Sequence, residues 1–541
     1  MKKNQIIVFA ILILLVSFVS LLPSLSNGFV GGDDSNYVLK NPLIRDLSWR
    51  GVRNIFTSMH LGLYKPLTML SFALEYHYFK LGPYTYHLTN LILHLLNALL
   101  VFWLILLVSR KAWVSFIVAL LFGIHPMHVE SVAWVSERKD VLYSLFFLSG
   151  IIAYIYSLRD KKRVYHYLTF FLFILTLLVK PMGLTFPFIL LLCDYILYIK
   201  LDKDNLKSKA VFFITSGIFL GFTLIFASGY ASRQPSFGFF DGIFIANYAL
   251  LFYLAKIILP LKLCVLYPYP HKNGNLLPFI FLISPLFLLF LTSAVIFSRR
   301  YTRKIIFGSL FFLICVFPVI QLVPTGGYAI VADRYAYLSS IGIFYIIAEF
   351  IAWLYQNKSG KAPVIKALVI AGLAMAIVTL SFLSWNRCKV WRGPDAWFDD
   401  ALKSYPSEIR ERLRFYREKI GRNHGSPEDY NNLAVIYGEL GSHETAISLC
   451  QKAIEINPNS PEAYNNLSAA YGFSKDFDKS IEFSQKSLAL DPRFASAYNN
   501  LAVAYYYKQQ YALAIQNIDT AIRLGFKADS AFLKELNKYR K

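Results

Sequence analysis

The amino-acid sequence predicts an all-α protein, in which a polytopic membrane bundle of about eleven spanning helices precedes an α-solenoid of short helical repeats. Three observations support this fold class. The 541-residue chain is 56% hydrophobic and only 16% charged, whereas soluble domains carry about 25% charge. Apolar stretches long enough to cross about 30 Å of hydrocarbon recur as far as residue 384. A polar tail with a regular repeat follows, so we expect a membrane domain, residues 1–384, and a separate soluble part.

The predicted spans alternate with loops, and every second loop carries the basic cluster that marks a cytoplasmic loop. The first apolar run follows Lys2 and Lys3 and is long enough to be a retained span rather than a cleaved signal peptide. The same rule places the loops 125–139 and 324–338, and the whole C-terminal tail, outside the cytoplasm. The predicted spans are residues 6–26, 88–108, 112–125, 140–157, 164–179, 182–199, 209–228, 276–297, 304–323, 339–355 and 364–384.

One apolar segment does not fit this alternation. Residues 243–260 are apolar enough to cross, but a span there would move the basic cluster at residues 299–304 to the other side of the membrane. We therefore expect residues 229–275 to form an outer loop with a re-entrant or surface helix. With that choice, the loops with unusual chemistry all share one side of the membrane.

A period of 34 residues begins at Pro427, where Tyr430, Tyr464 and Tyr498 recur in step. This is the period of tetratricopeptide repeats, helical hairpins that stack into a superhelix with a concave binding surface. Such a surface predicts a protein partner. We expect a linker with a degenerate repeat in residues 385–426, three repeats in residues 427–460, 461–494 and 495–528, and a capping helix in residues 529–541.

Paired asparagines recur with the same period and include Asn432, Asn466 and Asn500. Their amides could line the concave groove and hold an extended peptide backbone. Ordinary packing between repeats is the alternative interpretation. Both interpretations stay open on the sequence alone.

Composition excludes several other classes of protein. The formal net charge of +22 lies in short clusters between apolar runs rather than on a soluble domain, so we expect no nucleic-acid partner. The five cysteines are scattered, without a C-x-x-C pair, and they indicate neither a disulfide framework nor a zinc site.

Two adjacent carboxylates, Asp33 and Asp34, follow the first span in the stretch NGFVGGDDSNY. Neighbouring carboxylates repel each other unless a cation or a proton-transfer role stabilises them. One of them could be the general base that removes a proton from an acceptor hydroxyl. The alternative is a solvated acidic turn.

A dense group of ionisable side chains lies between the third and fourth predicted spans, in HPMHVESVAWVSERKD. Charged residues this close to lipid are candidates for function, and basic residues on the outer side are what an anion-binding site requires. A metal site is the alternative for the two histidines and the first glutamate, but this spacing is common without metal, so none is expected. The candidate residues are His125, His128, Glu130, Arg138 and Lys139.

Three further basic residues are candidates for contact with a phosphate. Arg334 lies among aromatic residues in an outer loop, where it could grip a phosphate or pair with Asp333. Lys65 precedes a proline in the first outer loop, beside Tyr64, and Lys180 precedes a proline that interrupts the apolar run between two predicted spans. Either lysine could be a point-charge phosphate contact or could simply extend to the interface.

These motifs, in this order, resemble the transmembrane and tetratricopeptide repeat-containing protein family, whose members look like type C glycosyltransferases of the protein O-mannosyltransferase kind. The resemblance rests on DDSNYVLKNP, YKPLTMLSFALEYHYFKLGPYTYHLTNLILHLLNALL, HPMHVESVAWVSERKDVLYSLFFL, DRYAYLSSIG and the repeats. It implies a monosaccharide donor on a polyprenyl or dolichyl phosphate and transfer to a protein hydroxyl outside the cytoplasm. The short repeat array and the short first loop depart from the family and leave the acceptor open.

The resemblance places Asp33 and Asp34 at the family's acidic pair, with one of them as the base, and direct attack would then invert the anomeric centre. The basic and histidine side chains named above would surround the donor. The expected protein is therefore an integral-membrane glycosyltransferase whose repeats recruit the acceptor. The alternative is a non-enzymatic membrane-anchored repeat scaffold. The expected location is a bacterial inner membrane with periplasmic repeats, or the endoplasmic reticulum in a eukaryote.

Overall fold

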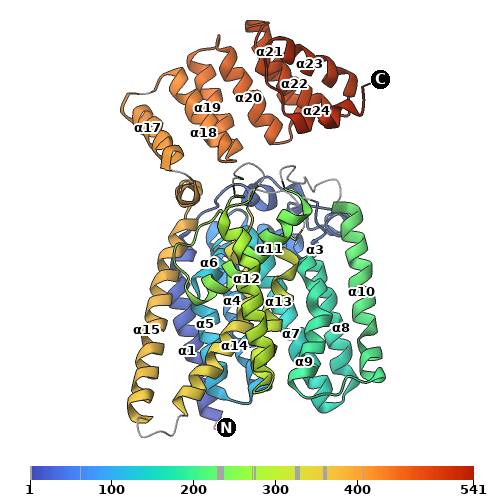
Figure 1. Ribbon diagram of the computed structural model, residues 1–541, viewed down its shortest axis with the longest axis vertical. Coiled ribbons are helices and arrows are strands. Elements are labelled where there is room, and N and C mark those ends of the chain that lie inside the picture. Colours follow the sequence, from blue (N-terminus) through green and yellow to red (C-terminus); the bar gives the residue numbers. More distant parts are fainter. Residues whose placement is uncertain are drawn as a thin grey trace. The chain divides into compact units, whose positions relative to one another are not determined.

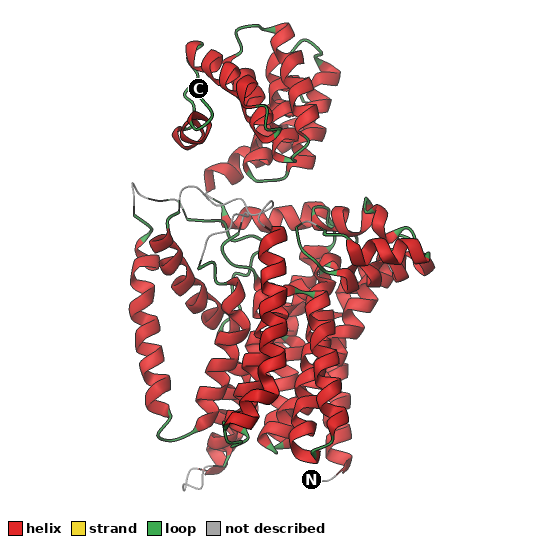
Figure 2. Cartoon of the chain, turned by 90° about the vertical axis from the view of Figure 1, so that its right-hand side faces the viewer, coloured by secondary structure: helices red, strands yellow, loops and turns green. Residues whose placement is uncertain are grey.

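The computed structural model divides the chain into two compact units, Met1–Ser404 and Tyr405–Lys541. Both units are built from helices and loops (Figures 1 and 2). Within the part of the chain that the structure describes there is no β-strand beyond two isolated bridges, so the predicted all-α fold class is confirmed. The described residues are 3–60, 62–227, 237–270, 272, 276–322, 329–356, 362–405, 407–423 and 425–540.

The first unit contains eight long apolar helices that satisfy the length and composition of a membrane span. The bent pair α5 and α6, with an angle of 52° between its helices, would make a ninth span if it crosses as one element. The long helices are α1 (Lys3–Leu21), α4 (Pro83–Ser109), α7 (Arg138–Asp160), α10 (Lys203–Ala227), α11 (Phe239–Ile258), α12 (Phe279–Ser298), α14 (Ala336–Tyr355) and α15 (Ala362–Cys388). The shorter ones are α2 (Trp49–Thr57), α3 (Pro66–Phe79), α5 (Ala112–Ile124), α6 (Val129–Ala133), α8 (Arg163–Val179), α9 (Phe186–Ile196), α13 (Arg303–Val316) and α16 (Pro394–Ala401).

The predicted number of eleven spans is not confirmed. The predicted spans 164–179 and 182–199 form α8 and α9, which are apolar but shorter than a full span. Helix α13 ends at Val316, although the apolar run continues to residue 323. Hydropathy alone does not report such breaks, because a proline or a polar turn ends the helix while the surrounding residues stay apolar.

Helix α11 differs from the expected outer-loop helix, because its length and composition are those of a candidate span. Its polar contacts connect it to the loops beside the candidate site. The hydroxyl of Tyr253 accepts a hydrogen bond from the amide of Ala332 at 3.2 Å, and the carbonyl of Ile257 lies 3.1 Å from Nε2 of His125. Figure 1 shows α11 at the end of the bundle where α3 and α6 lie, away from the N-terminus.

The first unit extends beyond residue 384, where we expected a linker to begin. The side chain of Asn27 donates to the carbonyl of Cys388 at 3.0 Å, and the amide of Gly28 donates to the carbonyl of Arg392 at 2.9 Å. The buried ring of Trp391 also stacks on Trp134, with 5.0 Å between the ring centroids. These contacts make the end of α15 and the following helix α16 part of the membrane unit.

The second unit is a stack of helical hairpins preceded by helix α17, which packs on α18. Local signals set the helix starts: Ser426 and Ser460 cap α18 and α20 through their side chains. The small residues Ala446, Ser480 and Ala514 are buried where paired helices touch. The helices are α17 (Ser407–Asn423), α18 (Pro427–Glu439), α19 (His443–Ile456), α20 (Pro461–Phe473), α21 (Phe477–Leu490), α22 (Ala495–Tyr507), α23 (Tyr511–Arg523) and α24 (Ser530–Asn537).

Candidate active site

The two adjacent carboxylates occupy different environments. Asp34 is only 1% exposed, and one of its oxygens accepts a hydrogen bond from the amide of Val30 at 3.0 Å. Its other oxygen accepts bonds from the hydroxyl and, at 2.9 Å, from the backbone amide of Ser136. Burial raises the pKa of this carboxyl to about 6, although the three donors oppose that rise. Asp34 therefore holds the loop after the first span against the segment that begins α7.

Asp33 is the accessible member of the pair. Its side chain is 39% exposed, and its Oδ2 lies 3.8 Å from Nζ of Lys139. The same ammonium lies 2.9 Å from Oε1 of the buried Glu137. Gly31 and Gly32, with φ of 82° and 54°, form the left-handed turn that leads into the pair. Asp33 is thus a carboxylate beside a cation and open to an incoming molecule.

A second lysine joins this group across an aromatic ring. Nζ of Lys65 lies 4.3 Å from the ring centroid of Tyr37, and Nζ of Lys139 lies 4.9 Å from the same centroid. Lys65 is only 3% exposed, and no ion-pair partner for it exists among the described residues. Burial and the charge of Lys139 lower the pKa of Lys65 to about 7. An anion bound here would offset the repulsion between the two ammonium groups.

Arg334 is held by two glutamates rather than by its neighbour. Its backbone amide donates to Oε2 of Glu130 at 2.9 Å, and its guanidinium contacts the other oxygen of the same carboxylate. Nε of Arg334 also lies 3.4 Å from Oε1 of Glu137. The expected alternative, pairing with Asp333, is wrong, because Asp333 lies 3.5 Å from the guanidinium of Arg387 instead. Glu137 therefore connects Arg334 to Lys139 and to the Asp33 group.

Lys180 lies on the other side of Arg334. Its ammonium contacts Asp140 of α7 and lies 5.6 Å from the ring centroid of Tyr335. Lys180, Asp140, Arg334 and Tyr335 line one narrow cavity of about 10 Å³, room for about one water molecule. The structure thus brings Asp33, Lys65, Lys139, Lys180 and Arg334 into one connected set of charged groups.

Arg138 does not belong to this set, although it precedes Lys139 in the sequence. It is 1% exposed, and its guanidinium contacts the carboxylate of Glu75. It also donates to the side chain of Asn90 and to the carbonyl of Tyr86, both at 2.9 Å. With these partners Arg138 joins α3, α4 and α7, and the expected donor-binding role does not fit its position.

The two histidines are likewise buried in packing contacts. Nδ1 of His125 accepts a bond from the amide of Met127 at 3.3 Å. His128 contacts the carbonyl of Phe122 at 2.7 Å and the hydroxyl of Ser340 at 3.1 Å. The ring nitrogens of both histidines are thus committed to protein groups away from Asp33. Among the described residues, no group of three or more His, Cys, Asp or Glu side chains could hold a metal ion.

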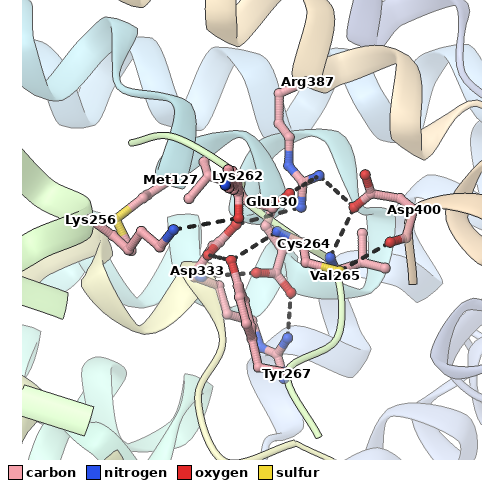
Figure 3. A network of polar contacts seen from close by, with 12 residues as sticks. Met127, Glu130, Lys256, Lys262, Cys264, Val265, Tyr267, Asp333, Arg387 and Asp400 are labelled. Carbon is pink, nitrogen blue, oxygen red and sulfur yellow. Dashed lines mark hydrogen bonds and ion pairs between the residues drawn. The ribbon is translucent and has the colours of Figure 1, made fainter. Parts of the chain in front are cut away.

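Sequence reasoning missed a buried ionic network beside the site, drawn in Figure 3. Arg387 contacts Asp400 and lies 3.5 Å from Asp333. Asp333 also accepts a hydrogen bond from the hydroxyl of Tyr267 at 2.9 Å, and that hydroxyl accepts one from the amide of Cys264 at 2.8 Å. The network fixes the turn that carries Arg334. Its members lie far apart in the sequence, so no local motif could have indicated them.

In the repeats, two of the three singled-out asparagines bond to the preceding repeat. The side-chain amide of Asn466 donates to Oδ1 of Asn431 at 2.9 Å, and that of Asn500 donates to Oδ1 of Asn465 at 2.9 Å. Asn432 is exposed. The geometry therefore supports the packing interpretation for Asn466 and Asn500 and leaves Asn432 open for a ligand.

Comparison with known proteins agrees with both units. A family model described as tetratricopeptide repeat matches residues 429–493. Human protein O-mannosyl-transferase TMTC1 is 24% identical over 488 residues, which cover 76% of this chain and 53% of that protein. Human TMTC3 is 27% identical over 63% of this chain and 40% of its own length. The Caenorhabditis elegans protein O-mannosyl-transferase F38B6.6 is 25% identical over 62% of this chain and 50% of its own.

This chain resembles the transmembrane and tetratricopeptide repeat-containing proteins. The resemblance that its motifs indicated is thereby confirmed, as is its character as a multi-pass membrane protein with tetratricopeptide repeats. The chain spans about half the length of these relatives, or less. The crystal structure of YrrB, a repeat protein described as having an unusual peptide-binding site, matches 32% of this chain and 88% of its own at 16% identity, and its TM-score of 0.22 carries no argument.

These relatives are named protein O-mannosyl-transferases, and the name describes those proteins. This chain carries an accessible carboxylate, Asp33, beside Lys139 and Lys65. What that arrangement can do chemically follows from its own geometry.

Proposed function

We propose that the membrane unit is a glycosyltransferase that moves a monosaccharide from a polyprenyl or dolichyl phosphate to a hydroxyl of a protein outside the cytoplasm. One observation carries the proposal: of two adjacent carboxylates, Asp34 is anchored by three donors, whereas Asp33 is exposed beside Lys139. A general base must be reachable by the proton that it accepts. Asp33 meets this requirement and Asp34 does not.

The proposed reaction is a single displacement. Asp33 accepts the proton of the acceptor hydroxyl while the hydroxyl oxygen forms a bond to the anomeric carbon of the sugar. The bond between that carbon and the phosphate oxygen breaks, and its electron pair leaves with the polyprenyl phosphate. Because one base acts on one face of the sugar, the configuration at the anomeric carbon inverts.

The lysines would stabilise the charge that develops on the leaving phosphate. Lys65 and Lys139 place two ammonium groups around the ring of Tyr37, close to Asp33. Buried or half-buried cations act strongly on a developing negative charge, because little water screens them. Lys180 and Arg334 belong to the same set of charged groups, but each is already paired, with Asp140 and with Glu130, so the donor phosphate is assigned to Lys65 and Lys139.

The repeats would recruit the acceptor or a partner protein. Tetratricopeptide repeats form a concave surface that accepts peptides, and Asn432 is the singled-out asparagine whose side chain is exposed. We assign the site and the repeats to the extracytoplasmic side, in a bacterial inner membrane or in the endoplasmic reticulum. If the site and the repeats were on the cytoplasmic side, the basic clusters between the spans would lie outside the cytoplasm, against the usual distribution of Lys and Arg.

The test is transfer of a radiolabelled sugar from a polyprenyl-phosphate monosaccharide to protein in membranes that contain the full chain. Asp33→Asn should reduce transfer at least about a hundredfold, because a general base contributes about 10² to 10⁴. The matched control is Asp395→Asn, an exposed carboxylate in the same unit, which should leave transfer unchanged.

Three outcomes would change the assignment. If Asp33→Asn matches wild type, Asp33 is not the base. If Asp34→Asn abolishes transfer while its thermal unfolding is unchanged, Asp34 takes that role. If wild type transfers no sugar from a panel of polyprenyl-phosphate donors, the protein is a membrane-anchored repeat scaffold rather than an enzyme.

A further inference from the structure

A groove runs between α1 and the end of α15, apart from the site around Asp33. Figure 1 shows these two helices side by side in the membrane unit, and they are in contact. The groove consists of two hollows that share Trp385 and Lys389, with volumes of about 570 and 540 Å³. Apolar side chains line the first hollow, among them Leu15, Val19 and Phe382.

The groove opens toward lipid rather than toward the helix bundle. Only 6% of the apolar window of α15 is buried within the protein, so much of the surface of this helix is available to lipid. Trp385 and Tyr84 line the second hollow, where α15 ends and α4 begins. Tryptophan and tyrosine gather where hydrocarbon meets the headgroups, so the second hollow lies at headgroup depth.

Two uncompensated cations lie at this depth. Arg392 lines the second hollow, and its guanidinium has no partner among the described residues. The ammonium of Lys389 contacts the side-chain oxygen of Asn386 at 2.9 Å and has no carboxylate partner in the part of the chain that the structure describes. The described residues that line the two hollows include no carboxylate. Arg387, near the end of α15 and close to Lys389 in the sequence, is neutralised by Asp400, whereas no carboxylate among the described residues pairs with Lys389 or Arg392.

We propose that this groove binds one anionic phospholipid of the bilayer. Its acyl chain lies along the first hollow, against Leu15 and Phe382, and its phosphate lies between Lys389 and Arg392. Apolar walls that end in two unpaired cations are complementary to a lipid with a negatively charged headgroup. The bound lipid would brace the end of α15, whose backbone supports the loop that leads to Asp33 through the bonds of Asn27 and Gly28.

The experiment places the full-length protein in nanodiscs of dioleoyl-phosphatidylcholine that contain increasing amounts of brominated dioleoyl-phosphatidylglycerol. Bromine atoms on the lipid tails quench nearby tryptophan fluorescence. The difference in quenching between wild type and Trp385→Phe comes from Trp385, and it therefore measures the lipid that occupies the groove. Brominated dioleoyl-phosphatidylcholine, in otherwise identical discs, reports contact with ordinary boundary lipid.

We expect phosphatidylglycerol to quench the Trp385 signal at about twenty-five-fold lower mole fraction than phosphatidylcholine, because each cation near a headgroup contributes about fivefold. Lys389→Gln/Arg392→Gln should remove this preference without removing quenching at high mole fraction. The matched control, Arg493→Gln/Lys527→Gln, removes two exposed charges from the repeat unit and should keep the preference.

Three results would overturn the proposal. Equal quenching by both phospholipids in wild type, or an unchanged preference in Lys389→Gln/Arg392→Gln, would show that these two cations do not select an anionic lipid. Displacement of brominated phosphatidylglycerol by a lower mole fraction of polyprenyl phosphate would assign the groove to that carrier instead. None of these results depends on whether the protein transfers sugar, so the test is independent of the proposed enzyme activity.

Discussion

The carboxylate of Asp34 accepts hydrogen bonds from both the backbone amide and the hydroxyl of Ser136, which lies 102 residues further along the chain. The contact connects the loop after α1 to the start of α7, where Lys139 is found. Asp33 and Lys139 come within 3.8 Å of each other as a result. The geometry of the proposed site therefore depends on a residue that does no chemistry itself.

Ser136→Ala tests this dependence. A buried hydrogen bond to a charged group contributes about 1.5 to 3 kcal/mol, so the variant should unfold at lower temperature. Sugar transfer should fall while the pH dependence keeps its shape, because Asp33 remains. Thermal unfolding and transfer are measured together. Ser71→Ala, which removes a bond within one helix, is the control and should change transfer little. Full transfer by Ser136→Ala would contradict the positioning role.

The pH dependence of the proposed enzyme should depend on Lys65. Burial and the charge of Lys139 lower the pKa of Lys65 from 10.5 to about 7, so its ammonium is charged below that pH and neutral above it. If the charge binds the donor phosphate, kcat/KM for the donor should fall as the pH rises through about 7. Lys65→Arg should keep the positive charge and extend activity to higher pH.

The measurement is kcat/KM for the donor between about pH 6 and pH 9, because this parameter reports the ionisation of the free enzyme. Lys65→Met should lower kcat/KM below about pH 7, where the wild-type lysine is charged, should approach wild type at higher pH, and should lose the decline near pH 7. Lys80→Arg, at an exposed lysine in the same unit, serves as control. An unchanged profile in Lys65→Arg would show that another group sets the decline.

Much of the fold could be predicted because the patterns that specify it are local. Runs of apolar residues and a 34-residue period are visible in short windows, and the structure has the corresponding long helices and hairpins. The end of the membrane unit was less predictable. The polar composition of residues 385–404 predicts a linker. Asn27 and Trp134 nevertheless hold this segment in place through contacts that form only after folding.

At the candidate site, too, contacts between residues far apart in the sequence could not be predicted. Arg138 and Lys139 are neighbours, and charge alone gives both the same role. Adjacent residues on a helix point about 100° apart, so one contacts Glu75 in the interior and the other Asp33 at the site. The partner of each charge could not be read from the sequence, because Glu75 lies 63 positions from Arg138.

This difference predicts opposite behaviour for the two basic residues. Arg138→Met leaves the buried carboxylate of Glu75 without its ion-pair partner and with the hydroxyl of Thr89 as its remaining donor, which costs about 3 to 5 kcal/mol, and should unfold the membrane unit at lower temperature. Lys139→Met should reduce sugar transfer and should lower the unfolding temperature less, because Arg334 still lies 3.4 Å from the carboxylate of Glu137. Thermal unfolding in detergent is the measurement. Glu75→Gln/Arg138→Met should recover part of the lost stability, because it removes the unpaired charge. Equal effects of Arg138→Met and Lys139→Met on unfolding would contradict the assignment.

The asparagines of the repeats separate packing from ligand binding. Asn466 and Asn500 donate to Asn431 and Asn465 of the preceding repeats, so their replacement by alanine leaves acceptors unpaired at the junctions. We expect each to lower stability by about 0.5 to 1.5 kcal/mol. Hydrogen exchange of α20 and α22 in the full chain should then be faster. Asn432→Ala, at an exposed position, should leave exchange unchanged and should weaken capture of an acceptor peptide if that amide binds it. Stacked repeats depend on their junctions for stability. If exchange becomes faster in Asn432→Ala but not in the other two variants, Asn432 is the residue that holds a junction, and Asn466 and Asn500 are the candidates for ligand binding.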